Sequence, residues 1–300
     1  MSKFSARRGF TLVELLVVIG ILGVLSAVLL GSFGGMTDSA RAAKCMSNMR
    51  TLATACQNAA LRDSHYPLAA SCEYMYVDES QGFKHAKKAY GERKGWISWA
   101  SMGAYRSKPS NSCVSKGWHK SAYEQDEETV TYCLTNGVLW KFVAGNRSVY
   151  VCPEHVKAAK KVGLTPNWSF AMNAYFGGDP AMEALTFGDS YHGIEYGALD
   201  RADRRLLFAE LPFRDGIDSS VNASDAAFQY KGFSGWGGAP DEIYFNHSSG
   251  KGRFAHIVFA DGHAERLAYP KNGVDAKELA KWLCEGTDVS FSGSEYKKLN

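Results

Sequence analysis

The sequence predicts an α+β fold, in which a long N-terminal α-helix packs on an antiparallel β-sheet head with large loop insertions. Two observations predict the helix: an apolar run over residues 10–30, and an apolar stripe that recurs every three or four residues over residues 38–63. A third observation predicts the sheet, because apolar stretches in the second half of the chain are bounded by turn residues.

The apolar run combines a basic flank with a single acid. Two arginines and a glycine precede it, and Glu14 is the only charged residue between Phe10 and Leu30. A helix of about 21 residues is about 31 Å long, which matches the hydrocarbon core of a bilayer. Basic residues before the run and none within it predict a single membrane pass, with the remaining chain outside the cytoplasm.

A cleaved secretory signal is the alternative interpretation of this run. Such a signal requires small residues in an A-x-A pattern after the apolar stretch, and Leu25-Ser26-Ala27 fits that pattern poorly. It also leaves unexplained why Gly-Phe-Thr-Leu-Val-Glu stands at the start of the run.

The second helical stretch follows a group of glycines at positions 31, 34 and 35, which predicts an interruption of the helix. Asp38 is the expected N-cap, and the helix is expected to end near Asp63. One face of this stretch is expected to pack on the head. It comprises Ala42, Met46, Met49, Leu52 or Ala53, Cys56 and Ala60.

Several stretches of the head are typical of strands, among them residues 147–151, 205–211 and 253–260. The pair Asp261-Gly262, which separates the last stretch from residues 263–268, predicts a hairpin. A final helix is expected to begin at Asp275, because Glu278 completes a capping box, and to end before Gly286.

Composition and charge exclude some classes of function. The chain has 34 basic and 31 acidic residues, and the three basic residues before Phe10 account for the excess. A balanced charge argues against nucleic acid as a partner bound through bulk charge. No hydrolase, phosphate-loop or H-E-x-x-H motif is present, so neither an enzyme nor a cofactor is expected. Seven cysteines in an exported chain predict disulfides, with at least one thiol left over.

The order Arg-Arg-Gly-Phe-Thr-Leu-Val-Glu at residues 7–14, followed by an uncharged apolar run, resembles the signature of type IV prepilins and type II secretion pseudopilins. The resemblance implies that a prepilin peptidase cuts between Gly9 and Phe10 and that the new amino group of Phe10 is methylated. It also implies that Glu14 meets the amino terminus of Phe10 in a neighbouring subunit, so that this residue acts in assembly.

The same resemblance implies a domain organisation and a location. Residues 1–9 form the leader, residues 10–63 the helical stem with its membrane and assembly part at 10–30, and residues 64–300 the pilin-like head. The expected partners are other pilin or pseudopilin subunits and the secretion or assembly machinery of the bacterial inner membrane. The head is expected in the periplasm, before assembly into a type II secretion pseudopilus or a type IV pilus-like filament.

The head also resembles a branch of this family that carries a histidine followed by Asp-Gly. The matching pieces, in order, are residues 44–50, 65–67, 150–153, 168–173, 245–247 and 257–263. Thirteen residues separate His247 from Asp261, whereas that branch usually has nine.

Two groups of residues in the head are candidate metal ligands. His247, Asp261 and His263 offer imidazole and carboxylate groups. The alternative is a hairpin in which Asp261 turns the chain and His247 hydrogen-bonds a loop. The second group is oxygen-rich and resembles the calcium-binding region of major pseudopilins, although its spacing fits no defined calcium loop. It comprises Asp215, Asp218, Asn222 and Asp225.

The head is larger than a minimal pilin head, which favours a second hypothesis. The protein would then be a membrane-anchored extracytoplasmic module that binds polysaccharide or another ligand. Trp96, Trp99 and Tyr105 are candidates for a sugar-stacking surface, with an aromatic core as the alternative.

Overall fold

The computed structural model describes residues 11–69, 95–97, 131, 134–135, 137–161, 166–176, 194–212, 226–228, 230 and 241–299. The side chains of residues 27–36 and 291 are not among the described features. The chain divides into two compact units, Met1–Ala40 and Arg41–Asn300. Helix α1 (Leu12–Asp63) contributes residues to both units.

Helix α1 is continuous through the glycines at positions 31, 34 and 35. The predicted interruption is therefore wrong. Each glycine lowers helix stability by only about 1 kcal/mol, and apolar helix-forming residues flank the group on its N-terminal side. The sequence predicts a membrane span over residues 10–30. In the part of the chain that the structure describes, no helix is both long enough and apolar enough to cross a bilayer.

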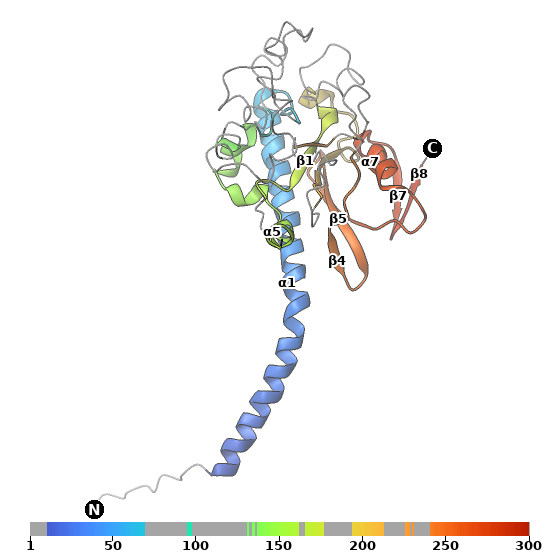
Figure 1. Ribbon diagram of the computed structural model, residues 1–300. Coiled ribbons are helices and arrows are strands. Elements are labelled where there is room, and N and C mark those ends of the chain that lie inside the picture. Colours follow the sequence, from blue (N-terminus) through green and yellow to red (C-terminus); the bar gives the residue numbers. More distant parts are fainter. Residues whose placement is uncertain are drawn as a thin grey trace, which may run out of the picture. The chain divides into compact units, whose positions relative to one another are not determined.

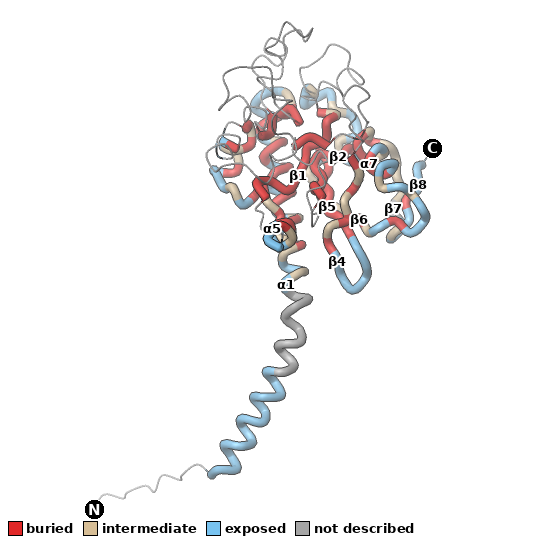
Figure 2. The backbone as a smooth tube through the Cα atoms, viewed as in Figure 1, coloured by how far each residue is buried: buried red, intermediate tan, exposed pale blue. Residues whose placement is uncertain are grey.

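The part of α1 that belongs to the larger unit presents one face to the core of the head (Figure 2). The predicted apolar stripe is confirmed except for Met46, which is half-buried. The buried face also includes Cys45 and Asn48. The amide of Asn48 donates to the backbone oxygens of Ser148 and Val151, each at 2.9 Å, and so ties α1 to a loop of the head.

The head is built on a six-stranded sheet in the order β3-β1-β2-β5-β4, with β6 paired to β5. Figure 1 labels β1, β4 and β5 of this sheet. The strands are β1 (Phe170–Asn173), β2 (Leu206–Glu210), β3 (Ala227–Phe228), β4 (His247–Ser249), β5 (Gly252–Phe259) and β6 (Ala264–Ala268). The α+β class is confirmed, but the sheet is mixed, because β1 and β3 run parallel. The long connection between these two strands brings the chain back to the free edge of β1 in the same direction.

The hairpin predicted around Asp261-Gly262 is present as β5 and β6, with Val258 opposite Ala264. Residues 260–263 form the connection, and Gly262 has a φ of +92°, which a glycine adopts without strain. The expected last helix is α7 (Ala276–Cys284), capped by the side chain of Asp275. Strands β7 (Val289–Ser292) and β8 (Glu295–Lys298) form a separate two-stranded sheet after it.

One predicted strand is a helix instead. Residues 147–151 contain the 3₁₀-helix η3 (Arg147–Tyr150), because the side chain of Asn146 accepts a hydrogen bond from the backbone nitrogen of Ser148. Among the described residues, further short helices are η2 (Val138–Val143), α5 (Pro153–Lys160), η4 (Ala174–Phe176) and η5 (Tyr196–Ala198).

Replacing Gly137 with alanine should destabilise the head by about 1–3 kcal/mol. A Cβ atom at this position would clash with the backbone oxygen of Trp96 and lie 2.7 Å from the Cα atom of Ile97. Denaturant unfolding of the full chain in detergent measures the loss. Gly250→Ala is the matched control, because nothing lies within 4 Å of its Cβ position. Equal stability of the two variants would show that the segment at residues 95–97 does not pack tightly on Gly137.

Candidate functional site

The first described residues form a capping box at the start of α1. The backbone nitrogen and the hydroxyl of Thr11 both donate to Glu14 Oε2 at 2.8 Å. The backbone nitrogen of Glu14 in turn donates to the Thr11 hydroxyl at 3.2 Å. This reciprocal pattern satisfies two of the donors that a helix N-terminus leaves unpaired. Glu14 therefore has a local partner within its own chain, a role that the sequence analysis missed although the T-x-x-E pattern signals it.

Gly9 and Phe10, the predicted cleavage and methylation residues, lie outside the described part of the chain. The oxygen-rich candidates Asp215, Asp218, Asn222 and Asp225 also fall there. Cleavage, methylation and calcium binding at these positions therefore remain predictions.

The structure does not bring the other three candidate ligands together. Asp261 and His263 form a pair at the β5–β6 connection, with 2.5 Å between Asp261 Oδ1 and His263 Nδ1, and both side chains are about two-fifths exposed. Asp261 also accepts from the backbone nitrogen of His263, so it shapes the turn. His247 instead lies inside a buried cluster with residues that the sequence analysis did not single out.

That cluster, here named the Glu210 cluster, comprises Cys45, Glu210, His247 and His256. The potential ligand atoms of all four residues lie within 4.8 Å of one another, and all four residues are buried. It is the one group of this kind among the described residues.

Four different elements contribute to the Glu210 cluster. Cys45 comes from α1, and Glu210 ends β2. His247 begins β4, opposite Phe254 of β5, and His256 follows two residues after Phe254 on the same face. The register of β2 on β5 pairs Ala209 with Ile257, so the next step brings Glu210 beside His256. Strand pairing and helix packing thus determine the cluster together.

One oxygen atom forms the centre of the cluster. Glu210 Oε1 lies 2.7 Å from His247 Nε2, 2.9 Å from His256 Nδ1 and 3.1 Å from Cys45 Sγ. An ionised carboxylate only accepts hydrogen bonds, so all three neighbours donate to it. The second carboxylate oxygen, Oε2, receives the amide of Asn246 at 3.4 Å.

A second layer of polar groups surrounds the cluster. Cys152 Sγ lies 3.9 Å from His247 Nε2, and the backbone nitrogen of Cys152 donates to the hydroxyl of Ser169 at 2.9 Å. The same hydroxyl contacts His155 Nδ1, also at 2.9 Å. These contacts limit the rotation of the side chains next to the cluster.

The surroundings determine the protonation of these groups. Burial would raise the pKa of Glu210, but hydrogen bonds from His247 and His256 lower it to about 2. Burial also opposes charge on His247, yet the contacts with Cys152 and Glu210 raise its pKa to about 10. Burial raises the pKa of Cys45 well above its ordinary value. The carboxylate is thus ionised, whereas the thiol of Cys45 holds its proton.

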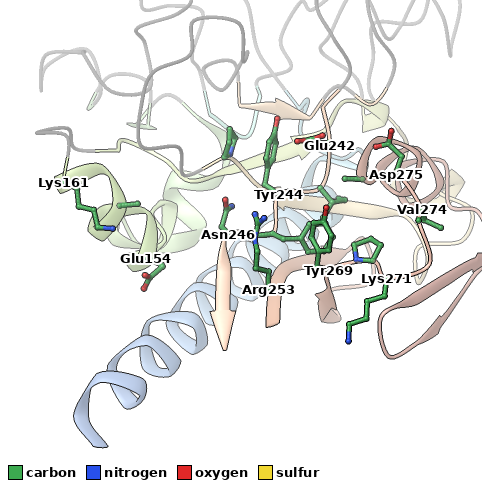
Figure 3. Close-up of a pocket in the computed structure, with 17 residues that line it drawn as sticks. Glu154, Lys161, Glu242, Tyr244, Asn246, Arg253, Tyr269, Lys271, Val274 and Asp275 are labelled. Atoms are coloured by element: carbon green, nitrogen blue, oxygen red, sulfur yellow. The ribbon is translucent and has the colours of Figure 1, made fainter. Parts of the chain in front are cut away.

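A pocket of about 930 Å³ lies beside the cluster and is lined by polar groups of both charges (Figure 3). Asn246 lines the pocket and donates to Glu210, so a single side chain connects the two features. Arg253 lies on the same wall, where its Nε donates to the backbone oxygen of Phe245 at 3.0 Å.

Trp96 does not form part of an exposed aromatic surface, although one interpretation of the sequence predicts such a surface. This side chain is fully buried, its Nε1 donates to the backbone oxygen of Ala226 at 3.0 Å, and its ring stacks on Tyr150. The aromatic-core alternative therefore holds for Trp96, whereas Trp99 and Tyr105 lie outside the described residues. The four described cysteines, at positions 45, 56, 152 and 284, are buried free thiols.

Comparison with known proteins supports a class for the chain. Residues 4–30 match the family described as the prokaryotic N-terminal methylation motif. This motif, at the start of a helix that continues into an α+β head, supports the type IV pilin-like family.

Individual relatives agree with that class. Two fimbrial proteins of Pseudomonas aeruginosa are each 34% identical to the chain over 93 residues. The matched region is 31% of this chain and 59% of each relative, so the chain spans less than two thirds of the length of the curated proteins it matches. No solved structure matches the chain.

Proposed function

We propose that this protein is a structural subunit of a filament, made as a membrane-anchored precursor and processed by a prepilin peptidase. The observation that carries the proposal is the N-terminal methylation motif at residues 4–30. The fimbrial relatives support assembly with further pilin subunits. The proposal extends to anchoring in the bacterial inner membrane, with the head in the periplasm before assembly.

The capping box at the start of α1 explains how one glutamate can serve both precursor and filament. Thr11 partners the carboxylate of Glu14 within the single chain. Cleavage after Gly9 would create a positive amino group on Phe10, four residues from Glu14. In a filament, Glu14 then pairs with the amino group of a neighbouring subunit, and a misregistered subunit leaves this charge unpaired at low dielectric.

The filament is either a type II secretion pseudopilus or a type IV pilus-like fibre. Both arrangements use the same processing and the same stem, so the N-terminal motif supports them equally. The pocket next to the Glu210 cluster favours the second candidate function, a head that binds a ligand. The polar lining of the pocket is suited to a charged or hydrogen-bonding ligand. The burial of Trp96 argues against the sugar-stacking surface that was expected around this residue.

Processing should be directly visible at the N-terminus of the protein. We expect mass spectrometry of the cell-associated protein to find a chain that begins with methylated Phe10. Gly9→Leu should retain residues 1–9, because a bulky side chain stands at the cleavage position, and its chain should be missing from sheared surface fractions. Lys3→Ala, which changes the leader away from the cleavage position, is the control. An unprocessed wild-type chain found in surface filaments would contradict the proposal.

A further inference from the structure

We infer that Cys45, Glu210, His247 and His256 bind one zinc ion that joins α1 to the sheet of the head. The inference is independent of filament assembly, because it rests on side chains of the larger unit only. Thiolate, imidazole and carboxylate are the ligand types that zinc takes in proteins, and four protein ligands are typical of structural zinc.

The four ligand atoms lie close enough together for one ion to be bound among them. Bonds of about 2.0–2.3 Å in a tetrahedron separate neighbouring ligand atoms by about 3.3–3.6 Å. In the structure, Glu210 Oε1 lies 2.7–3.1 Å from the other three ligand atoms. The four ligand atoms all lie within 4.8 Å of one another, so binding requires Glu210 Oε1 to move outward by about 0.5 Å and the other three atoms to lie about 3.3–3.6 Å from one another.

Charge balance favours a divalent ion at this position. Binding requires Cys45 and His247 to release to solvent the protons that they direct at Glu210. His256 must carry its proton on Nε2, so that all three ligand atoms offer a lone pair. One thiolate and one carboxylate then neutralise Zn²⁺, so the occupied site has no net charge in a fully buried environment. Without an ion, the core holds a buried carboxylate, two imidazoles and a thiol, a combination that adds little stability compared with apolar side chains of similar size.

The ligand types discriminate among ions. Calcium and magnesium prefer oxygen ligands only, and this site offers sulfur and nitrogen as well. Copper electron-transfer sites combine two histidines and a cysteine with a weak axial ligand, whereas the carboxylate of Glu210 is a strong ligand. The mixture of one sulfur, two nitrogens and one oxygen is therefore best suited to zinc.

Neighbouring residues support the ligands. Asn246 donates to the non-central oxygen of Glu210, which orients the carboxylate. The same residue lines the 930 Å³ pocket (Figure 3), so one side chain contacts both the pocket and the cluster. Cys152 contacts His247 at 3.9 Å and lies next to the ligand set.

Metal analysis of the full-length chain, purified in detergent under reducing conditions and supplied with Zn²⁺, tests the inference. We expect elemental mass spectrometry to find one zinc ion per chain. Replacement of zinc by Co²⁺ should give the visible bands of a tetrahedral ion and a thiolate charge-transfer band. Chelation should lower the melting temperature of the head.

Two matched substitutions separate the site from general effects on folding. Cys45→Ser should lower the affinity for zinc by more than the ~10–100-fold seen when a supporting residue is lost. Cys56→Ser changes another buried thiol of the same helix that lies outside the cluster, and it should keep one zinc per chain. His247→Ala and Cys45→Ser should both lose the visible bands of tetrahedral Co²⁺.

Three results would overturn the inference. A reduced wild-type chain that binds no zinc after reconstitution would exclude the site, and copper at one ion per chain in place of zinc would exclude the proposed ion. A disulfide between Cys45 and Cys152 as the prevailing form in cells, detected by intact mass before and after reduction, would remove a ligand. None of these results depends on whether filaments form, so they leave the proposed function untouched.

Discussion

Replacing Glu14 with glutamine should leave the precursor folded, anchored and processed, yet prevent its assembly into filaments. Glutamine at this position of a capping box still accepts from the backbone nitrogen of Thr11, so the start of α1 keeps its cap. The substitution removes only the negative charge, and with it the attraction to the amino group of Phe10 in a neighbouring subunit. We expect a loss of more than about 90% of sheared filaments, which corresponds to about 1.4 kcal/mol or more per contact.

The matched variant is Thr11→Ala, which removes the hydroxyl that contacts Glu14 but keeps the charge. It should weaken the cap by about 1 kcal/mol and still assemble. Immunoblots of membrane and sheared fractions measure processing and assembly separately. If Glu14→Gln assembled normally while Thr11→Ala did not, Glu14 would act as a helix cap and the pairing between subunits would be wrong.

Replacing Glu210 with alanine should destabilise the metal-free head by about 3–5 kcal/mol, which is the usual loss when one partner of a buried charged pair is removed. Glu210 is fully buried, and its Oε1 accepts from His247, His256 and Cys45. Without it, three donors lose their acceptor in the core. His247 also loses a partner that raises its pKa to about 10.

Denaturant unfolding of the full chain in the presence of a chelator measures this effect independently of zinc. Glu295→Ala is the control, because Glu295 is an exposed glutamate of β8, and a change within about 0.5 kcal/mol is expected there. A loss below about 1 kcal/mol for Glu210→Ala would mean that the three donors find other partners once the carboxylate is gone.

Local patterns predicted much of the fold. The apolar stripe predicted the buried face of α1, the Asp-Gly pair predicted the β5–β6 hairpin, and Asp275 predicted the start of α7. These signals depend on residues close together in the sequence, which is why they can be read without a structure. The predicted interruption at the glycines failed, because helical hydrogen bonding along the backbone outweighed their weak preference. The predicted strand at residues 147–151 failed, because the side chain of Asn146 caps a 3₁₀-helix there.

The same local patterns could not predict the Glu210 cluster. Its members are far apart in the chain, at positions 45, 210, 247 and 256, and no spacing relates them. His247 was singled out, but with Asp261 and His263, which lie instead at an exposed turn. Cys45 was not part of the predicted stripe, and its place beside Met46 on the same helix was the one available sign that a thiol enters the core.

The sequence by itself supports the pilin-like class, because the methylation motif at residues 4–30 is one continuous segment that is recognised without a structure. It also determined the helix-first order of the fold, since helical periodicity is local. Only the tertiary structure decided that a carboxylate, two imidazoles and a thiol share one buried position. Strand register and the packing of α1 create that position, and both depend on contacts between residues up to 211 positions apart, such as Cys45 and His256.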